Sequence, residues 1–177
     1  MCGILGYVGT QNHAAQAVLE GLKTLEYRGY DSWGIAVKRN QKLLVEKHVG
    51  KIGNSHSKLP TSNLGIGHTR WATHGGVTTK NAHPHMDCKG EVAVVHNGII
   101  ENFEELKKQL VKQGHSFHSE TDTEVIPHLI EEHLKKEGLA SSIRDTFNKL
   151  KGLNALVAAY APSREIVAAK TGSPLVV

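Results

Sequence analysis

The chain has 177 residues, of which 39% are hydrophobic and 21% charged, and its net charge at pH 7 is +4. This length fits one domain with a substantial core. Lysines and arginines are scattered, which argues against a nucleic-acid surface. No apolar run is long enough to span a bilayer, and no secretory signal is apparent. With only two cysteines, Cys2 and Cys88, we expect no disulfide framework and a reducing, cytoplasmic location.

The first half of the chain combines strand-like and helix-like segments. Apolar or alternating runs predict four strands: 4–8, 33–38, 43–48 and 64–70. The second and third strands are expected to form a hairpin. Apolar residues at helical spacing predict a helix over 12–26, followed by a turn at 28–32. Residues 50–63 and 72–90 are expected to be loops, and the second is long enough to be functional.

The second half begins with a nearly continuous apolar strand, 91–96, which we expect to be covered on both faces. Three helices should follow: one starting at a capping-box-like Asn102, then 121–136 and 139–150. Pro127 should displace the start of the second of these helices or kink it. Strands are expected at 153–160 and 165–169.

The strands therefore group at both ends of the sequence, with helices between them. Two packed sheets covered by helices would satisfy this pattern, and so would a single mixed sheet. Residues 172–177 predict a turn and the start of an apolar strand. Because an unpaired hydrophobic edge promotes aggregation, we expect the chain to be a fragment of something longer.

Cys2 is the first residue that could carry chemistry. The initiator methionine before a cysteine is normally trimmed, which would leave Cys2 with a thiol and a free α-amine. Such a residue contains a nucleophile and its own base, as in N-terminal nucleophile enzymes. The alternative is that Cys2 is only a small apolar residue at the start of a strand.

Four polar clusters at strand ends or turns could supply the rest of an acyl-transfer site: 28–32, 68–75, 96–102 and 119–124. In the third cluster, the Asn97 amide and the Gly98 backbone N–H could form an oxyanion hole. An Asn-Gly pair is also a common hairpin turn.

Two charged residues could hold an amino-acid substrate. Arg70 could clamp a carboxylate with two hydrogen bonds, or it could be a surface arginine. Asp122 could receive an ammonium group, or it could be a helix N-cap. Together with a thiol, these groups suit an α-amino acid that bears a side-chain amide.

The clusters, together with Cys2-Gly3-Ile4, resemble the glutaminase domain of class II glutamine amidotransferases. Within that family, Arg28-Gly29-Tyr30-Asp31-Ser32, the 68–75 segment and the 96–102 segment most resemble the glutamine–fructose-6-phosphate aminotransferases. The resemblance covers residues 1–177 in order. It implies an α+β fold of the N-terminal nucleophile hydrolase type, a four-layer α/β/β/α sandwich, here truncated at its C-terminus.

The resemblance also implies roles for individual residues. Cys2 would attack the side-chain amide of L-glutamine, Asn97 and Gly98 would stabilise the oxyanion, and Arg28 would support the nucleophile. The remaining implied residues would bind substrate or lie on the path of ammonia: Arg70, Trp71, Thr73, His74 and Asp122.

In the full-length family enzymes, ammonia passes to a C-terminal sugar-phosphate isomerase region whose acceptor is fructose 6-phosphate. This region is absent from the chain. The full-length enzyme is expected to be a homodimer, with no cofactor and no nucleic-acid or membrane partner. One departure from the family pattern is Trp33, which stands where a small residue is expected and could alter packing near Arg28.

A metal-binding function is the main alternative from another class. His83, His85, Cys88 and His96 are residue types that bind zinc, but their spacing matches no standard finger, so we expect no metal site. His115, His118, His128 and His133 are expected to be solvated or to cap helices, and Cys88 to be an inert, partly buried thiol. If Met1 were retained, a non-catalytic glutamine-binding domain would be favoured, because a peptide-bonded Cys2 nitrogen is no base.

Overall fold

The computed structural model describes residues 2–135, 138–172 and 175–177. Its strands form two antiparallel sheets, each with four strands. The first sheet has the order β1-β4-β2-β3, with these bounds: β1 Gly3–Val8, β2 Ser32–Arg39, β3 Lys42–Val49 and β4 Leu64–Arg70. The second has the order β5-β6-β7-β8: β5 His85–Met86, β6 Val92–Gly98, β7 Asn154–Tyr160 and β8 Glu165–Lys170.

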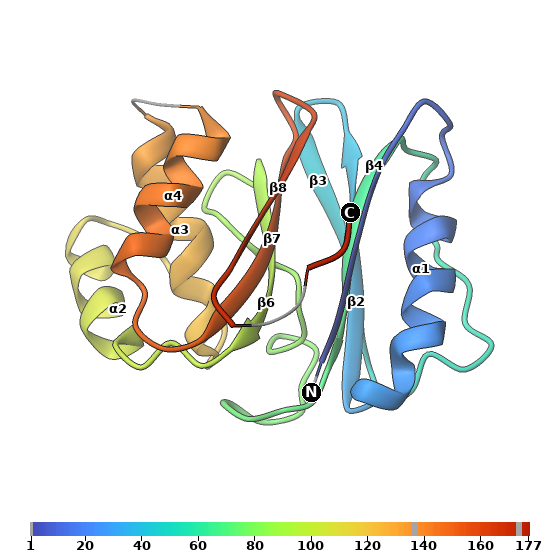
Figure 1. Ribbon diagram of the computed structural model, residues 1–177, viewed down its shortest axis with the longest axis horizontal. Helices are drawn as coiled ribbons and strands as arrows, with labels where there is room; N and C mark the ends of the chain where they lie inside the picture. The colour runs from blue at the N-terminus through green and yellow to red at the C-terminus, as the bar shows by residue number, and fades with distance from the viewer. Residues whose placement is uncertain (1, 136–137, 173–174) are drawn as a thin grey trace.

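Helices cover the outer face of each sheet (Figure 1). The first sheet is covered by α1 (Ala14–Leu25), which continues into the short 3-10 helix η1 (Glu26–Arg28). The second sheet is covered by α2 (Phe103–Lys112), α3 (Val125–Leu134) and α4 (Leu139–Lys149). The result is the expected α/β/β/α sandwich, and the alternative of a single mixed sheet is wrong.

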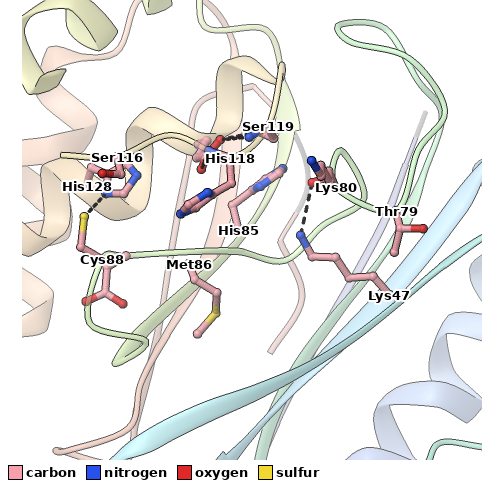
Figure 2. Close-up of a pocket in the computed structure, with 12 residues that line it drawn as sticks. Lys47, Thr79, Lys80, His85, Met86, Cys88, Ser116, His118, Ser119 and His128 are labelled. Atoms are coloured by element: carbon pink, nitrogen blue, oxygen red, sulfur yellow. Dashed lines mark hydrogen bonds between the residues drawn. The ribbon is translucent and has the colours of Figure 1, made fainter.

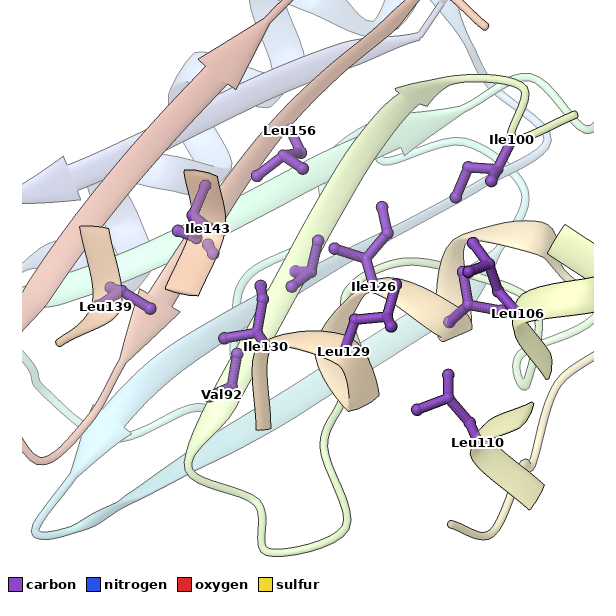
Figure 3. Packing of buried hydrophobic residues seen from close by; sticks show 13 residues of the cluster. Val92, Ile100, Leu106, Leu110, Ile126, Leu129, Ile130, Leu139, Ile143 and Leu156 are labelled. Atoms are coloured by element: carbon purple, nitrogen blue, oxygen red, sulfur yellow. The ribbon is translucent and has the colours of Figure 1, made fainter. Parts of the chain in front are cut away.

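Three apolar clusters hold the four layers together. The largest lies between the second sheet and helices α2–α4 (Figure 3). A second fills the space between the two sheets, and a third joins α1 to the first sheet. Strand β6 contributes to two of them: Val92 and Val94 face the helices, while Ala93 and Val95 face the other sheet. The prediction that this strand is covered on both faces is therefore confirmed.

Several local expectations differ from the structure. The predicted loop 72–90 contains the two-residue strand β5. Asn102 does not form a capping box: its side chain donates to the Lys149 carbonyl and accepts from the Lys151 N–H, both at 3.0 Å. These contacts fasten the start of α2 to the segment that follows α4.

The predicted helix 121–136 is divided into the 3-10 helix η2 (Asp122–Glu124) and α3. Pro127 lies in the first turn of α3, where its missing N–H costs no helical hydrogen bond. The predicted end of this helix at residue 136 lies outside the described residues.

At the C-terminus, residues 175–177 are exposed and form no strand, so the predicted strand start there is wrong. The turn predicted just before it includes residues 173–174, which are not described. Among the described helices, none has the length and apolar character needed to cross a membrane.

Trp33 fills the core under α1. Its side chain is 2% exposed and stacks on the His48 ring, with 4.4 Å between ring centroids. This large residue is therefore accommodated by the α1 side of the first sheet.

Candidate active site

The second residue of the chain lies among side chains from distant segments. The Cys2 carbonyl accepts a hydrogen bond from Arg28 Nε at 3.3 Å and another from Asn97 Nδ2 at 3.1 Å. The next residue, Gly3, donates its N–H to Thr69 Oγ1 at 3.0 Å. Strand β1 and the facing part of β4 thus place Cys2 beside Arg28 and Asn97, with Gly3 held on Thr69.

The sulfur of Cys2 contacts the backbone of Trp71. The Trp71 N–H donates to Sγ at 3.2 Å, and Sγ lies 3.7 Å from the Trp71 carbonyl oxygen. Burial raises the pKa of the Cys2 thiol, and the Trp71 N–H partly opposes this effect. The thiol therefore rests in its neutral form and needs a base to become a nucleophile.

Asn97 and Gly98 are part of strand β6, not a hairpin turn. In the register of the sheet, Asn97 faces Ala155 and Gly98 faces Asn154 of β7. The alternative that this pair forms a hairpin is therefore wrong. Gly98 has φ +140°, and a side chain there would collide with the Leu153 carbonyl and with Asn154 Oδ1. Only glycine fits this position.

His68 fixes the orientation of the Asn97 amide, a role that sequence reasoning did not assign. Its Nε2 lies 2.9 Å from Asn97 Oδ1, so Asn97 presents Nδ2 toward Cys2. Burial lowers the pKa of His68 to about 3, which keeps the ring neutral. A neutral ring with its proton on Nε2 is the donor that the amide oxygen requires.

Arg70 is buried, so the alternative of a surface arginine is wrong. Its guanidinium donates to the carbonyls of residues 74–76: to Gly76 at 3.3 Å, to Gly75 at 3.5 Å and, closely, to His74. Burial lowers its pKa, while the nearby Cys2 and Asp122 act in the opposite direction. Arg70 therefore places positive charge near the Cys2 thiol and also holds the loop after β4.

Asp122 does not cap its own helix. It is buried at the start of η2, and its Oδ2 accepts the Ile100 N–H at 2.8 Å. The N-cap alternative is therefore wrong, and the carboxylate instead holds the segment that follows the Asn97-Gly98 pair.

A second buried histidine connects these elements. His96 contacts Thr123 Oγ1 and Asn154 Oδ1, each at 2.9 Å, and burial lowers its pKa against the influence of Asp122.

The other predicted substrate-binding residues lie in the loop that follows β4. Trp71 is 47% exposed, and its ring meets that of Tyr30 edge to face, with 5.7 Å between centroids. Thr73 is exposed, and His74 packs edge to face on Phe103. Asp31, which was not assigned a role, accepts the Ala72 N–H at 2.9 Å and so holds the start of this loop.

The four residues considered as zinc ligands do not form one group. His96 is directed to Thr123 and Asn154, and His85 Nε2 lies 2.9 Å from Thr121 Oγ1. Cys88 is directed to His115 and His128 instead. His115 and His128 are buried, so the expectation that they are solvated or capping is wrong. Cys88 is exposed rather than partly buried.

Comparison with known proteins places the chain in a family. The family model of the glutamine amidotransferase domain matches residues 68–173 of this chain. The chain is 51% identical to the glutamine–fructose-6-phosphate aminotransferase (isomerizing) of Pyrococcus horikoshii and 52% identical to that of Streptomyces coelicolor. Each match covers 100% of this chain and 30% of the relative. The chain thus spans less than a third of the length of these curated relatives.

Solved structures agree with this assignment. The glutamine phosphoribosylpyrophosphate amidotransferase of B. subtilis, complexed with ADP and GMP, aligns with a TM-score of 0.72 at 30% identity. That alignment covers 91% of this chain and 35% of the other. The two sheets with their covering helices are the N-terminal nucleophile fold of such enzymes. The chain belongs to the class II glutamine amidotransferase family.

Proposed function

We propose that this chain hydrolyses L-glutamine to glutamate and ammonia through a thioester on Cys2. The observation that carries the proposal is the contact between Cys2 and Asn97, which lie 95 positions apart in the sequence. This contact holds the Asn97 amide against the carbonyl of the residue that carries the thiol, beside the buried charge of Arg70, and so supports a role for Asn97 as an oxyanion donor.

The first half of the reaction forms the thioester. After removal of Met1, the α-amine of Cys2 takes the thiol proton, and the sulfur adds to the amide carbon of glutamine. Asn97 Nδ2 and the Gly98 N–H donate to the oxyanion that forms. The C–N bond then breaks as the amine passes its proton to the leaving nitrogen, and ammonia departs.

Water completes the reaction. The Cys2 amine takes a proton from water, whose oxygen adds to the thioester carbon. The C–S bond breaks, the sulfur regains a proton, and glutamate leaves. Arg70 and Asp122 hold the two charged ends of the substrate, while Thr73, His74 and Trp71 line its approach. Arg28 keeps the Cys2 carbonyl in place.

We further propose that the ammonia aminates fructose 6-phosphate in a longer chain. The relatives whose names state that reaction extend well beyond the segment matched here. This step would need a region that binds the sugar phosphate elsewhere in that longer chain. A reducing compartment such as the cytoplasm suits the proposal, because the thiol of Cys2 must stay free.

The test is a glutaminase assay paired with intact-mass measurement. We expect the mass to show loss of Met1 and the chain to release glutamate. Cys2→Ala should abolish glutamate release while leaving the circular dichroism spectrum unchanged. Full activity in a chain that begins at Met1 would refute the role of the amine, and substantial activity in Cys2→Ala would refute the nucleophile.

A further inference from the structure

We propose that Cys88, His115, His128 and Glu131 form a structural zinc site between the end of β5 and helix α3. Their four candidate ligand atoms all lie within 4.8 Å of one another. His115, His128 and Glu131 are buried, while Cys88 lies at the surface. Figure 2 shows Cys88 and His128 facing each other beside an open pocket of about 430 Å³.

Of four distances between these atoms, three are close to the edges of a zinc tetrahedron, and the fourth is about 0.4 Å longer. Zinc binds sulfur at about 2.3 Å and imidazole nitrogen at about 2.0–2.1 Å, so tetrahedral S···N edges are about 3.5 Å and N···O edges about 3.4 Å. Cys88 Sγ lies 3.4 Å from His115 Nδ1 and 3.5 Å from His128 Nδ1. Glu131 Oε2 lies 3.3 Å and 3.8 Å from the same two nitrogens.

The hydrogen bonding of His115 favours a cation at the centre. Its Nε2 lies 2.9 Å from Glu132 Oε1, which fixes the ring proton on that nitrogen. In the neutral ring, Nδ1 then carries a lone pair, yet it faces the Glu131 carboxylate at 3.3 Å. A metal ion between them would accept electron pairs from both.

Two further observations fit zinc. The Glu132–His115 pair is the carboxylate–histidine arrangement that commonly orients metal-bound imidazoles. A thiolate and a carboxylate together would also neutralise the charge of Zn²⁺, which suits a largely buried site. Of the two nitrogens of His128, Nδ1 faces the group, while Nε2 is buried and has no hydrogen-bond partner among the described residues.

Such a metal ion would join three segments that are distant in sequence. Cys88 follows β5, His115 follows α2, and His128 and Glu131 lie one turn apart on α3. Four protein ligands leave no open position, so the site is structural rather than catalytic. The site does not depend on the proposed function, since it shares no residue with the Cys2 site.

The test measures zinc affinity of the full chain, prepared metal-free by chelation, in competition with a chromophoric chelator. We expect one zinc ion per chain. When the free zinc concentration is a hundred times Kd, Tm should rise by roughly 5–10 °C. Cys88→Ser and His115→Ala should each weaken binding more than tenfold, and Glu132→Gln should weaken it by roughly 10–100-fold. His118→Ala is the matched control, because His118 is an exposed histidine of the same segment, and it should bind as the parent chain does.

Cobalt gives a readout that does not depend on stability. Co²⁺ in the site should show a sulfur-to-metal charge-transfer band that Cys88→Ser removes and His118→Ala keeps. The proposal is overturned if the metal-free parent chain takes up neither ion, if Cys88→Ser binds zinc unchanged, or if His118→Ala loses as much affinity as the ligand variants.

Discussion

At the scale of single residues, the site depends on the amide of Asn97 being held in one orientation. His68 accounts for that orientation, because its Nε2 contacts the amide oxygen and leaves Nδ2 directed at Cys2. A hydrogen-bond donor held this way needs no reorganisation when charge develops on the substrate.

Replacing Asn97 should therefore affect the chemical step more than binding. We expect Asn97→Ala to lower kcat by roughly 10²–10³-fold, with a much smaller change in KM. Steady-state glutaminase kinetics would measure both values. A variant that raises KM and keeps kcat would show instead that Asn97 binds the ground state.

The polar residues of the site were predictable only as separate clusters. The motifs around Cys2, Arg70 and Asn97 indicated acyl-transfer chemistry because each contains a functional group at a strand end. His68 was inside one of those motifs, but a histidine that orients an amide has the same local sequence as one that fills a core. The Cys88 group was missed because its four residues come from three segments, and only the spacing of His128 and Glu131 is a local signal.

At the scale of elements, Trp33 is the largest side chain in the cluster that joins α1 to the first sheet. The ring is almost fully buried among the residues under this helix. We expect Trp33→Ala to lower the free energy of unfolding by about 3–5 kcal/mol, as for other large core aromatics. Denaturant unfolding would measure the loss.

The other tryptophan of the chain provides a matched control. Trp71 is 47% exposed, so Trp71→Ala should change stability far less than Trp33→Ala. Equal destabilisation by the two variants would contradict the assignment of Trp33 to the core.

The hydrophobic pattern predicted most of these elements, because the helices bury one face and strands such as β6 form nearly continuous apolar runs. It could not predict β5, whose two residues are too few to show a period. Nor could it predict that Asn102 and Asp122 bond to other segments instead of capping their own helices. Local sequence shows a capping residue, but tertiary contacts decide where its side chain goes.

At the scale of the whole molecule, buried histidines should make stability depend on pH. Burial lowers the pKa values of His68, His83, His85 and His96, whereas an unfolded histidine titrates near 6.5. Below pH 6.5 the unfolded chain therefore binds more protons than the folded chain. The free energy of unfolding should be greatest above this pH and should fall as the pH drops below it. The fall is about 1.4 kcal/mol per pH unit for each histidine that is protonated only in the unfolded chain.

Denaturant unfolding at pH 7.5, 6.0 and 5.0 would measure this slope. His68→Gln should reduce the slope, while His118→Gln, at an exposed position, should leave it unchanged. A free energy of unfolding that stays constant from pH 7.5 to 5.0 would contradict the prediction.

The contact between Cys2 and Asn97 also constrains the order of events during synthesis. The proposed nucleophile, Cys2, is synthesised 95 residues before Asn97, the proposed oxyanion donor. At about 5–20 residues per second, roughly 5–20 s separate the two. Under the proposed function, methionine trimming would thus have time to act on Cys2 before β1 and β6 pack together, so the α-amine would be free before the proposed site assembles.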